Sequence, residues 1–222
     1  MRLTHLFASL ALTATLVGCT SEIDNKPAAA VSDAKPADKT AAKDAKPGPP
    51  PPPPAAPVQG ATNAAVPAGA WGLAADSQID WVGAKVTNDH KGGFKTLSGH
   101  ATVADGKLTG ATVTITLESL FADHPKLEKH LKSADFFDVA THPSATFTLT
   151  SVVDGTATGT LDLHGVKKEL KFPATVEVTG TDAKVSAEFT LLRKDFGIVY
   201  PGKPEDLIRD EVLVKGTLHF KS

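Results

Sequence analysis

Hydrophobic and polar residues alternate one for one along most of the last two-thirds of this chain. Ala111, Val113, Ile115 and Leu117, for example, alternate with Thr112, Thr114, Thr116 and Glu118. Successive side chains of a β-strand point to opposite faces, so this period of two indicates antiparallel strands with one buried and one solvated face. The same alternation recurs in residues 79–83, 147–149, 161–163, 185–191 and 212–220.

Short turn signals separate these runs. Asp105-Gly106 and Asp154-Gly155 are dipeptides favoured in tight hairpins, and His164-Gly165 also lies between two strand-like runs. We count about eight strands in roughly 150 residues, which fits a β-sandwich or a small closed barrel. The sequence therefore predicts an all-β domain over residues 71–222.

Residues 119–139 depart from the strand pattern. Their leucines keep a rough helical spacing among charged residues, and Pro125 is suited to the first turn of a helix. Two adjacent aromatics, Phe136 and Phe137, follow between two aspartates. We expect a short helical segment that covers one end of the barrel.

The chain between residues 20 and 70 has a different composition. It consists largely of Ala, Pro, Lys, Asp and Gly, its acidic and basic residues balance, and it includes the proline run Pro49–Pro54. Such a segment buries too little apolar surface to offset its conformational entropy, which predicts disorder. A polyproline run is stiff and extended. The segment is therefore interpreted as a spacer that lifts the folded domain away from a membrane.

The first residues have the proportions of an export signal. Arg2 precedes an apolar stretch, residues 6–17, which at about a dozen residues is too short to cross a bilayer core of about 30 Å. The following Leu16-Val17-Gly18-Cys19 resembles the bacterial lipobox. The resemblance implies a signal peptide over residues 1–18, acylation of Cys19 and a linker over residues 19–70. Thr20 after the cysteine implies an outer-membrane lipoprotein that faces the periplasm.

Composition and charge narrow the possible functions. A formal net charge of -2 leaves no basic footprint for nucleic acid. A single cysteine excludes an intramolecular disulfide and a thiolate metal site, and no histidine pair has the spacing of a zinc motif. The sequence also lacks a nucleophile elbow and a phosphate-binding glycine loop. We therefore predict no catalytic residue, no metal and no cofactor.

Four blocks of the domain resemble the YceI-like family of exported polyisoprenoid-binding proteins. These blocks are residues 130–139, 142–147, 159–167 and 193–198, and they read HLKSADFFDV, HPSATF, GTLDLHGVK and RKDFGI. The resemblance implies an antiparallel, eight-stranded, lipocalin-like β-barrel with an apolar interior. Its expected partner is a polyisoprenoid or another long-chain, quinone-like lipid.

Apolar residues of the strands and of the helical segment are the candidates for binding this lipid. Adjacent Phe136 and Phe137 cannot both face inward if the chain is extended there. The same side chains could instead fill the barrel as an ordinary core, because an eight-stranded barrel is either just filled or holds one small ligand. The candidates are Trp81, Phe94, Val113, Ile115, Leu117, Phe136, Phe137, Phe147, Leu161, Phe189, Leu191 and Phe196.

Arg193, Lys194 and His130 are candidates for contact with a lipid headgroup, because guanidinium and ammonium groups pair readily with phosphate. Two alternatives stay open. In the first, Arg193 pairs with Asp195 or Asp210 to close the barrel instead of contacting a headgroup. In the second, His130 makes a structural hydrogen bond under the Phe136-Phe137 segment.

The leading hypothesis is non-enzymatic binding of a long apolar lipid, for sequestration or transport in the cell envelope. Burying each methylene contributes about 0.8 kcal/mol, so such binding needs shape and apolarity rather than a polar motif. The first alternative is a structural or stress-related envelope protein whose barrel is filled. The second is an enzyme that acts on a bound lipid. A homodimer, formed through an exposed barrel edge or the lid, also stays open.

Overall fold

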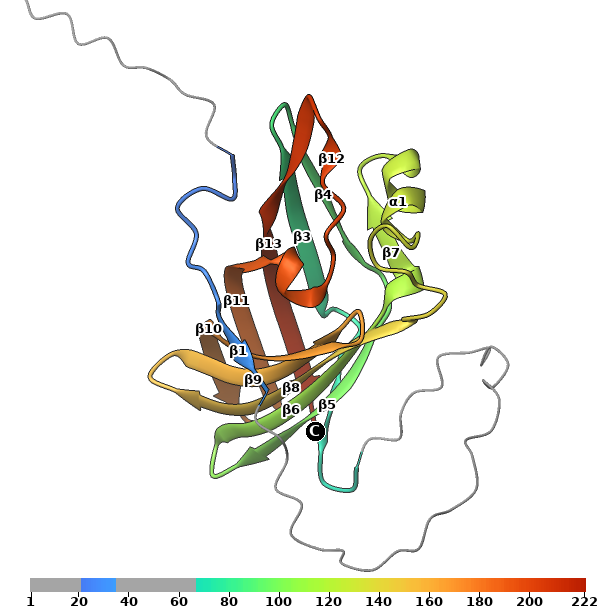
Figure 1. The fold of residues 1–222 in the computed structure, drawn as a ribbon. Helices are drawn as coiled ribbons and strands as arrows, with labels where there is room; N and C mark the ends of the chain where they lie inside the picture. The colour runs from blue at the N-terminus through green and yellow to red at the C-terminus, as the bar shows by residue number, and fades with distance from the viewer. Residues whose placement is uncertain (1–20, 35–66) are drawn as a thin grey trace, which may run out of the picture.

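The computed structural model describes residues 21–34 and 67–222 (Figure 1). The predictions for the signal peptide, for Cys19 and for residues 35–66 of the linker lie outside this range. Among the described residues, no helix combines the length and the apolar character needed to cross a membrane.

The described strands form a closed, antiparallel, eight-stranded barrel, as the sequence predicted. Around the ring the order is β2–β5–β6–β8–β9–β10–β11–β13, and β13 returns to β2 through the pair Phe220 and Leu73. The strands are β2 (Trp71–Leu73), β5 (Leu97–Ala104), β6 (Lys107–Thr116), β8 (Ser144–Val153), β9 (Thr156–Leu163), β10 (Val166–Thr179), β11 (Asp182–Leu192) and β13 (Asp206–Lys221).

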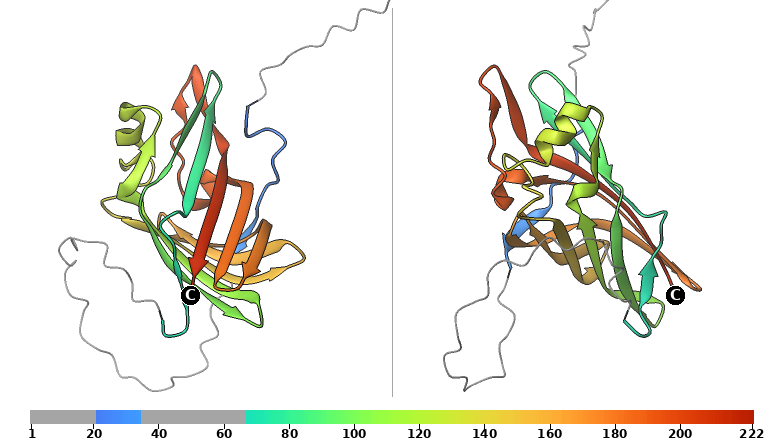
Figure 2. Two further views of the ribbon diagram at one scale, coloured as in Figure 1. Left: turned by 180° about the vertical axis from the view of Figure 1, so that it is seen from behind. Right: turned by 90° about the vertical axis from the view of Figure 1, so that its right-hand side faces the viewer.

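Further strands extend the wall beyond the ring at one end. There β13 continues to β3 (Gln78–Lys85), β4 (Asp89–Phe94) and β7 (Leu120–Ala122), and the short β12 (Gly202–Lys203) forms a hairpin with β13. We call this end, which comprises the β3–β4 and β12–β13 hairpins and α1, the mouth end. The far end comprises the β5–β6, β8–β9 and β10–β11 hairpins. Figure 2 shows α1 and the tall β3–β4 and β12–β13 hairpins together at the mouth end.

The predicted turn dipeptides form the hairpins. Asp105-Gly106 and Asp154-Gly155 have positive φ at both residues (52° and 70°, 48° and 72°), and His164-Gly165 does the same (53° and 76°). Left-handed conformations at both central positions match the right-handed twist of the flanking strands, which is why tight hairpins use them. The three dipeptides therefore set the register of β5–β6, β8–β9 and β9–β10.

The helical segment also forms where it was predicted. Helix α1 (Pro125–Leu131) starts with Pro125 in its first turn, and the His124 side chain caps it by accepting from the Lys126 amide. Proline fits there because the first amides of a helix have no partner within the helix. Two short 3₁₀ turns, η1 (Leu117–Ser119) and η2 (Arg193–Phe196), follow β6 and β11.

The prediction that the whole segment from Thr20 to Ala70 is disordered is wrong for residues 21–34. Here β1 (Ala30–Asp33) adds to the edge of β10 and pairs Val31 with Leu170. Residues 21–34 are held on the barrel by backbone hydrogen bonds and by apolar packing at few positions. Ile23 and Val31 supply that packing, in a segment whose composition contains few large apolar residues. Residues 35–66 therefore connect two strands of one barrel, β1 and β2, and do not separate residue 21 from the domain.

Candidate ligand-binding cavity

The interior of the barrel contains a cavity of about 600 Å³ that opens at the mouth end. Well-packed protein interiors hold few voids larger than a water molecule, and ligand pockets typically have about 300–1,000 Å³. The lining is apolar along the depth of the barrel and includes strand residues from β3, β6, β8, β9, β11 and β13. The structure therefore favours the hollow barrel over the filled one.

Strand periodicity explains which residues face the cavity. Strands β8, β9, β11 and β13 contribute mainly every second residue, and these are the apolar members of the alternating runs. Of the predicted lining residues, only Phe196 does not contact the cavity. Those that do are Trp81, Phe94, Val113, Ile115, Leu117, Phe136, Phe137, Phe147, Leu161, Phe189 and Leu191.

Phe196 is fully buried but lies outside the cavity lining. Strand β11 ends at Leu192 and the chain then turns through η2, so the strand alternation no longer applies at residue 196. The Phe196 carbonyl accepts from His164 Nδ1 at 3.2 Å when that nitrogen is protonated. Its place is thus in the packing between η2 and the β9–β10 hairpin.

Phe136 and Phe137 both line the cavity, which differs from the expectation for an extended chain. The chain is not extended here. The Phe136 amide donates to the Ser133 carbonyl and the Phe137 amide donates to the Leu131 carbonyl, both at 3.0 Å. This tight turn after α1 directs both rings toward the barrel.

Several lining residues were not among the candidates although the sequence contains the signal for them. The run Val212, Val214, Gly216, Leu218 and Phe220 lines the cavity along β13. Val185 and Ala187 do so along β11. Within one strand, residues separated by an even number of positions share a face. Assigning every apolar residue on the inward face of β11 and β13 to the lining would have found them.

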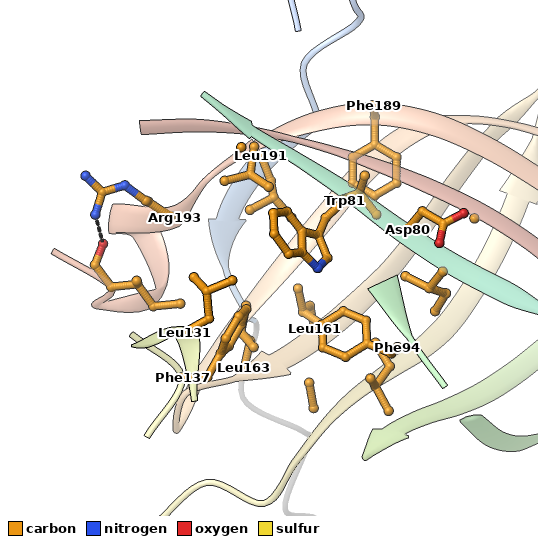
Figure 3. Close-up of a pocket in the computed structure, with 18 of the residues that line it drawn as sticks. Asp80, Trp81, Phe94, Leu131, Phe137, Leu161, Leu163, Phe189, Leu191 and Arg193 are labelled. Carbon is orange, nitrogen blue, oxygen red and sulfur yellow. Dashed lines mark hydrogen bonds between the residues drawn. The ribbon is translucent and has the colours of Figure 1, made fainter. Parts of the chain in front are cut away.

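Trp81 brings one polar atom into this apolar space. Among the described residues, the Trp81 indole Nε1 is the buried side-chain nitrogen or oxygen that has no hydrogen-bond partner. The ring has room because residue 92 is glycine; a Cβ there would collide with the Phe121 carbonyl and with the indole. Figure 3 shows the indole reaching into the cavity, near Leu161, Leu191 and Phe94. A buried donor without a partner is costly, so this atom favours a ligand that carries an acceptor.

Charged side chains gather at the mouth. Lys85 forms an ion pair with Asp206 at 2.7 Å across the β3–β4 and β12–β13 hairpins. The hydrogen bonds from Lys85 and then Thr87 hold the pKa of Asp206 below its ordinary value. The cavity thus has an apolar depth and a charged rim, whose members include Lys85, His90, His124, Lys126, Lys203, Asp206 and Arg209.

Arg193 touches the edge of the cavity, but its guanidinium group is engaged elsewhere. It donates to the carbonyls of Ile198 (2.8 Å) and Arg209 (3.1 Å) and forms an ion pair with Asp210 (3.0 Å). Figure 3 shows one hydrogen bond of the Arg193 guanidinium group as a dashed line beside the cavity. This arrangement matches the alternative in which Arg193 pairs with Asp210, and the pair joins η2 to β13.

Lys194 and His130 occupy different places. Lys194 pairs with Asp210 at 2.8 Å, is half-exposed and does not line the cavity. His130 does line it, but its Nε2 lies 2.9 Å from Asp135, and its ring packs edge-on against Phe136 and Tyr200. The structure therefore shows the structural hydrogen bond that was the simpler interpretation of His130, at a position that also faces the mouth.

A closed antiparallel barrel around one deep apolar cavity defines a lipocalin-like protein with an interior binding volume. Residues 73–220 match the YceI-like domain, and the chain therefore belongs to the YceI-like family. The resemblance inferred from the four sequence blocks is confirmed.

Relatives from bacteria support this assignment. A UPF0312 protein of Pseudomonas putida is 34% identical over 167 residues, which cover 65% of this chain and 87% of that protein. A UPF0312 protein of Pectobacterium atrosepticum is 42% identical over 96 residues, which cover 39% of this chain and 50% of the relative.

Solved structures share the fold. BcnA of Burkholderia cenocepacia aligns with a TM-score of 0.58 at 24% identity, over 65% of this chain and 96% of BcnA. A polyisoprenoid binding domain of Saccharophagus degradans, implicated in plant cell wall breakdown, aligns with a TM-score of 0.59 at 20% identity, over 68% of this chain and 98% of that domain. At these identities, the likeness establishes the barrel and nothing about its ligand.

Proposed function

We propose that this protein binds a long apolar lipid, an isoprenoid with a quinone-like head, inside its barrel and carries or sequesters it in the cell envelope. The observation that carries the proposal is the cavity of about 600 Å³, apolar in its depth and open at one end. Each methylene moved from water into such a site contributes about 0.8 kcal/mol, so a chain of many methylenes can offset the cost of association.

The structural neighbours give this proposal a second support. The Saccharophagus degradans domain is described as polyisoprenoid binding, and its barrel aligns over most of its length with this one. We extend that ligand class to this chain on the strength of its own cavity, because shared fold alone does not transfer function.

Trp81 supports a head that contains oxygen. A ring carbonyl within reach of the Trp81 Nε1 would accept the hydrogen bond that this buried donor lacks. A purely hydrocarbon ligand would leave the donor unpaired. A quinone-like isoprenoid therefore supplies both an apolar tail for the cavity wall and an acceptor for the unpaired Trp81 Nε1.

The proposed location is the outer membrane, with the barrel in the periplasm. The lipobox ending at Cys19 supports it, since acylation of that cysteine gives an anchor of two or more chains, and two chains hold firmly where one does not. We propose binding without conversion of the ligand, because the deep part of the cavity presents the Trp81 indole rather than a nucleophile beside a base.

Native mass spectrometry of the exported protein tests the proposal. The chain from Thr20 onward would be exported behind a cleavable leader and purified without refolding, so that it retains the lipid it acquired in the cell. We expect a discrete added mass that an organic extract identifies as an isoprenoid. A clean unliganded mass that does not change on addition of isoprenoid quinones would contradict the proposal.

A further inference from the structure

Residues 21–33, here called the N-terminal strap, begin at the mouth end of the barrel. Ser21 Oγ donates to Asp89, at the start of β4, at 2.7 Å. Glu22 forms ion pairs with Lys91 and Lys215. These cations hold the pKa of Glu22 at about 2, mainly through the hydrogen bonds from Lys215 and then Lys91. The start of the strap is thus fixed by several charged contacts.

Apolar packing adds to these contacts. Ile23 is only 3% exposed and packs with Val82, Ala84 and Leu213 on the outer face of β3 and β13. Asp24 pairs with Arg209 at 2.8 Å. An isoleucine buried in this way holds the strap firmly, because its whole side chain is removed from water.

The strap then completes the barrel wall. The Ala29 amide donates to the Thr190 carbonyl and the Thr190 amide donates to the Pro27 carbonyl, both at 2.8 Å. Beyond this point β1 pairs with the first half of β10, where β11 has separated from it. The strap lies outside residues 73–220, over which the chain matches the YceI-like domain. Figure 1 shows it in blue, running from the mouth end down the side of the barrel.

The same end of the molecule exposes large apolar side chains. Val86 at the β3–β4 turn is 73% exposed and Leu207 at the start of β13 is 49% exposed. The two hairpins are joined, since the Val86 amide donates to the Leu207 carbonyl at 3.2 Å. The rim residue Lys85 is the immediate neighbour of Val86 and lines the cavity opening. Two exposed apolar side chains do not by themselves form an interaction patch, but these two lie beside the opening of an apolar cavity.

The chain itself indicates which of these it meets. Cys19 precedes Ser21 by two residues, and two extended residues span at most about 7 Å. Ser21 in turn is bonded to the hairpin that carries Val86. Acyl chains on Cys19 would therefore enter the bilayer beside this hairpin, with no long spacer between the anchor and the barrel.

We propose that the mouth end docks on the surface of the anchoring bilayer, with Val86 and Leu207 inserted among the lipids and the cavity opening toward the membrane. This inference rests on the proposed acylation of Cys19 and deepens the proposed function. Two apolar side chains are too few to hold a soluble protein on a membrane. The strap and anchor hold them at a high effective concentration beside it. A lipid can then pass between bilayer and cavity without crossing water.

The test measures the depth of labelled positions in the full, acylated protein. Cys19 is the chain's one cysteine, so acylation leaves a newly introduced cysteine as the single free thiol. Val86→Cys and Leu207→Cys would be labelled with an NBD fluorophore and reconstituted into vesicles of phosphatidylethanolamine and phosphatidylglycerol. Val153→Cys is the matched control, because Val153 is 61% exposed at the β8–β9 hairpin of the far end.

We expect lipids that carry a doxyl quencher to quench the label at residues 86 and 207 several-fold more than the label at residue 153, with blue-shifted emission at the first two. Equal, water-like emission at all three positions would overturn docking. A mature mass without acyl chains on Cys19 would also overturn it. An isoprenoid in an organic extract of the purified protein, taken before reconstitution, would show in either case that the proposed ligand binding survives. Strong quenching at 86 and 207, with no isoprenoid in the extract taken before reconstitution, would support docking and contradict the ligand.

Discussion

The two ends of the barrel are built for different tasks. At the far end, short hairpins close the ring, and Phe220 is fully buried at the bottom of the cavity. There the His219 ring is held between Asp76 and Asp182, at 2.9 Å from each. At the mouth end, longer hairpins and α1 surround an opening with a charged rim, and the Val86 side chain is exposed.

The two ends therefore affect different properties: the far end affects the stability of the barrel, and the mouth end affects access of the ligand to the cavity. Inward side chains at the far end, such as Phe220, are packed on all sides, so changes to them act on the free energy of unfolding and on the depth of the cavity. Exposed side chains at the tips of the mouth end, such as Val86 and Leu207, have few neighbours to lose, so changes to them act on the entry of the ligand. The following variants test this division, in order of expected effect.

The largest effect should come from the far end. Phe220→Ala removes a fully buried ring, and such truncations cost about 3–5 kcal/mol in unfolding free energy. Val86→Ala, at an exposed position of the mouth, should change it by no more than about 0.5 kcal/mol. Urea unfolding followed by circular dichroism measures both. Comparable losses in the two variants would contradict the division between the ends.

A second pair of variants compares two glycines that face the cavity region. Gly92→Ala places a methyl group against the Phe121 carbonyl and the Trp81 ring, and such overpacking costs about 1–3 kcal/mol. Gly216→Ala meets nothing within 4 Å and should leave stability unchanged or slightly improved. Melting temperature and tryptophan emission are the readouts. An unaltered emission spectrum in Gly92→Ala would show that the glycine is not what gives Trp81 its room.

Trp81→Phe tests the head of the ligand rather than its tail. The change keeps an aromatic ring and removes the unpaired Nε1 donor, so affinity for an isoprenoid quinone should fall by about 5–10-fold, the value of one hydrogen bond. Affinity for a prenyl hydrocarbon of the same length should stay the same. Titrations with both ligands decide the matter, and an equal loss for the two would assign Trp81 a packing role only.

The smallest effect should be a pH dependence at the far end. Hydrogen bonds from His219 lower the pKa of both Asp76 and Asp182 relative to their ordinary value. A carboxyl with a lowered pKa in the folded state stabilises above its unfolded pKa of about 3.9 and loses that contribution as the pH falls through the folded value. Acid unfolding of Asp182→Asn should therefore show a shallower pH dependence below about pH 4 than the unchanged protein. Identical profiles would mean that this contact contributes nothing measurable.

Much of the fold followed from local pattern. Alternation gave the strands, Asp105-Gly106 and Asp154-Gly155 gave their hairpins, and Pro125 gave the start of α1. The parity of residues such as Val113 and Leu161 placed most of the cavity wall, because an inward position in a closed barrel depends only on the strand period.

Other features depend on contacts between distant segments. The docking of Ile23 against Val82 joins residues far apart in a stretch whose composition favours disorder, and no local signal encodes it. Arg193 pairs with Asp210 rather than facing a headgroup because its guanidinium group is also held by the Ile198 and Arg209 carbonyls. Phe196 does not line the cavity because it lies in the 3₁₀ turn η2, where the strand period no longer applies.

Photo-crosslinking of an isoprenoid quinone that carries a diazirine at the end of its tail tests the central claim most directly. If the tail fills the barrel with its head near Trp81, tandem mass spectrometry should find the crosslinks on inward residues of the far half, such as Phe220, Leu218 and Ala157, and excess unlabelled quinone should abolish them. Crosslinks on outward-facing residues such as Lys184 or Glu177, or labelling that unlabelled quinone does not compete, would show that the cavity is not the binding site.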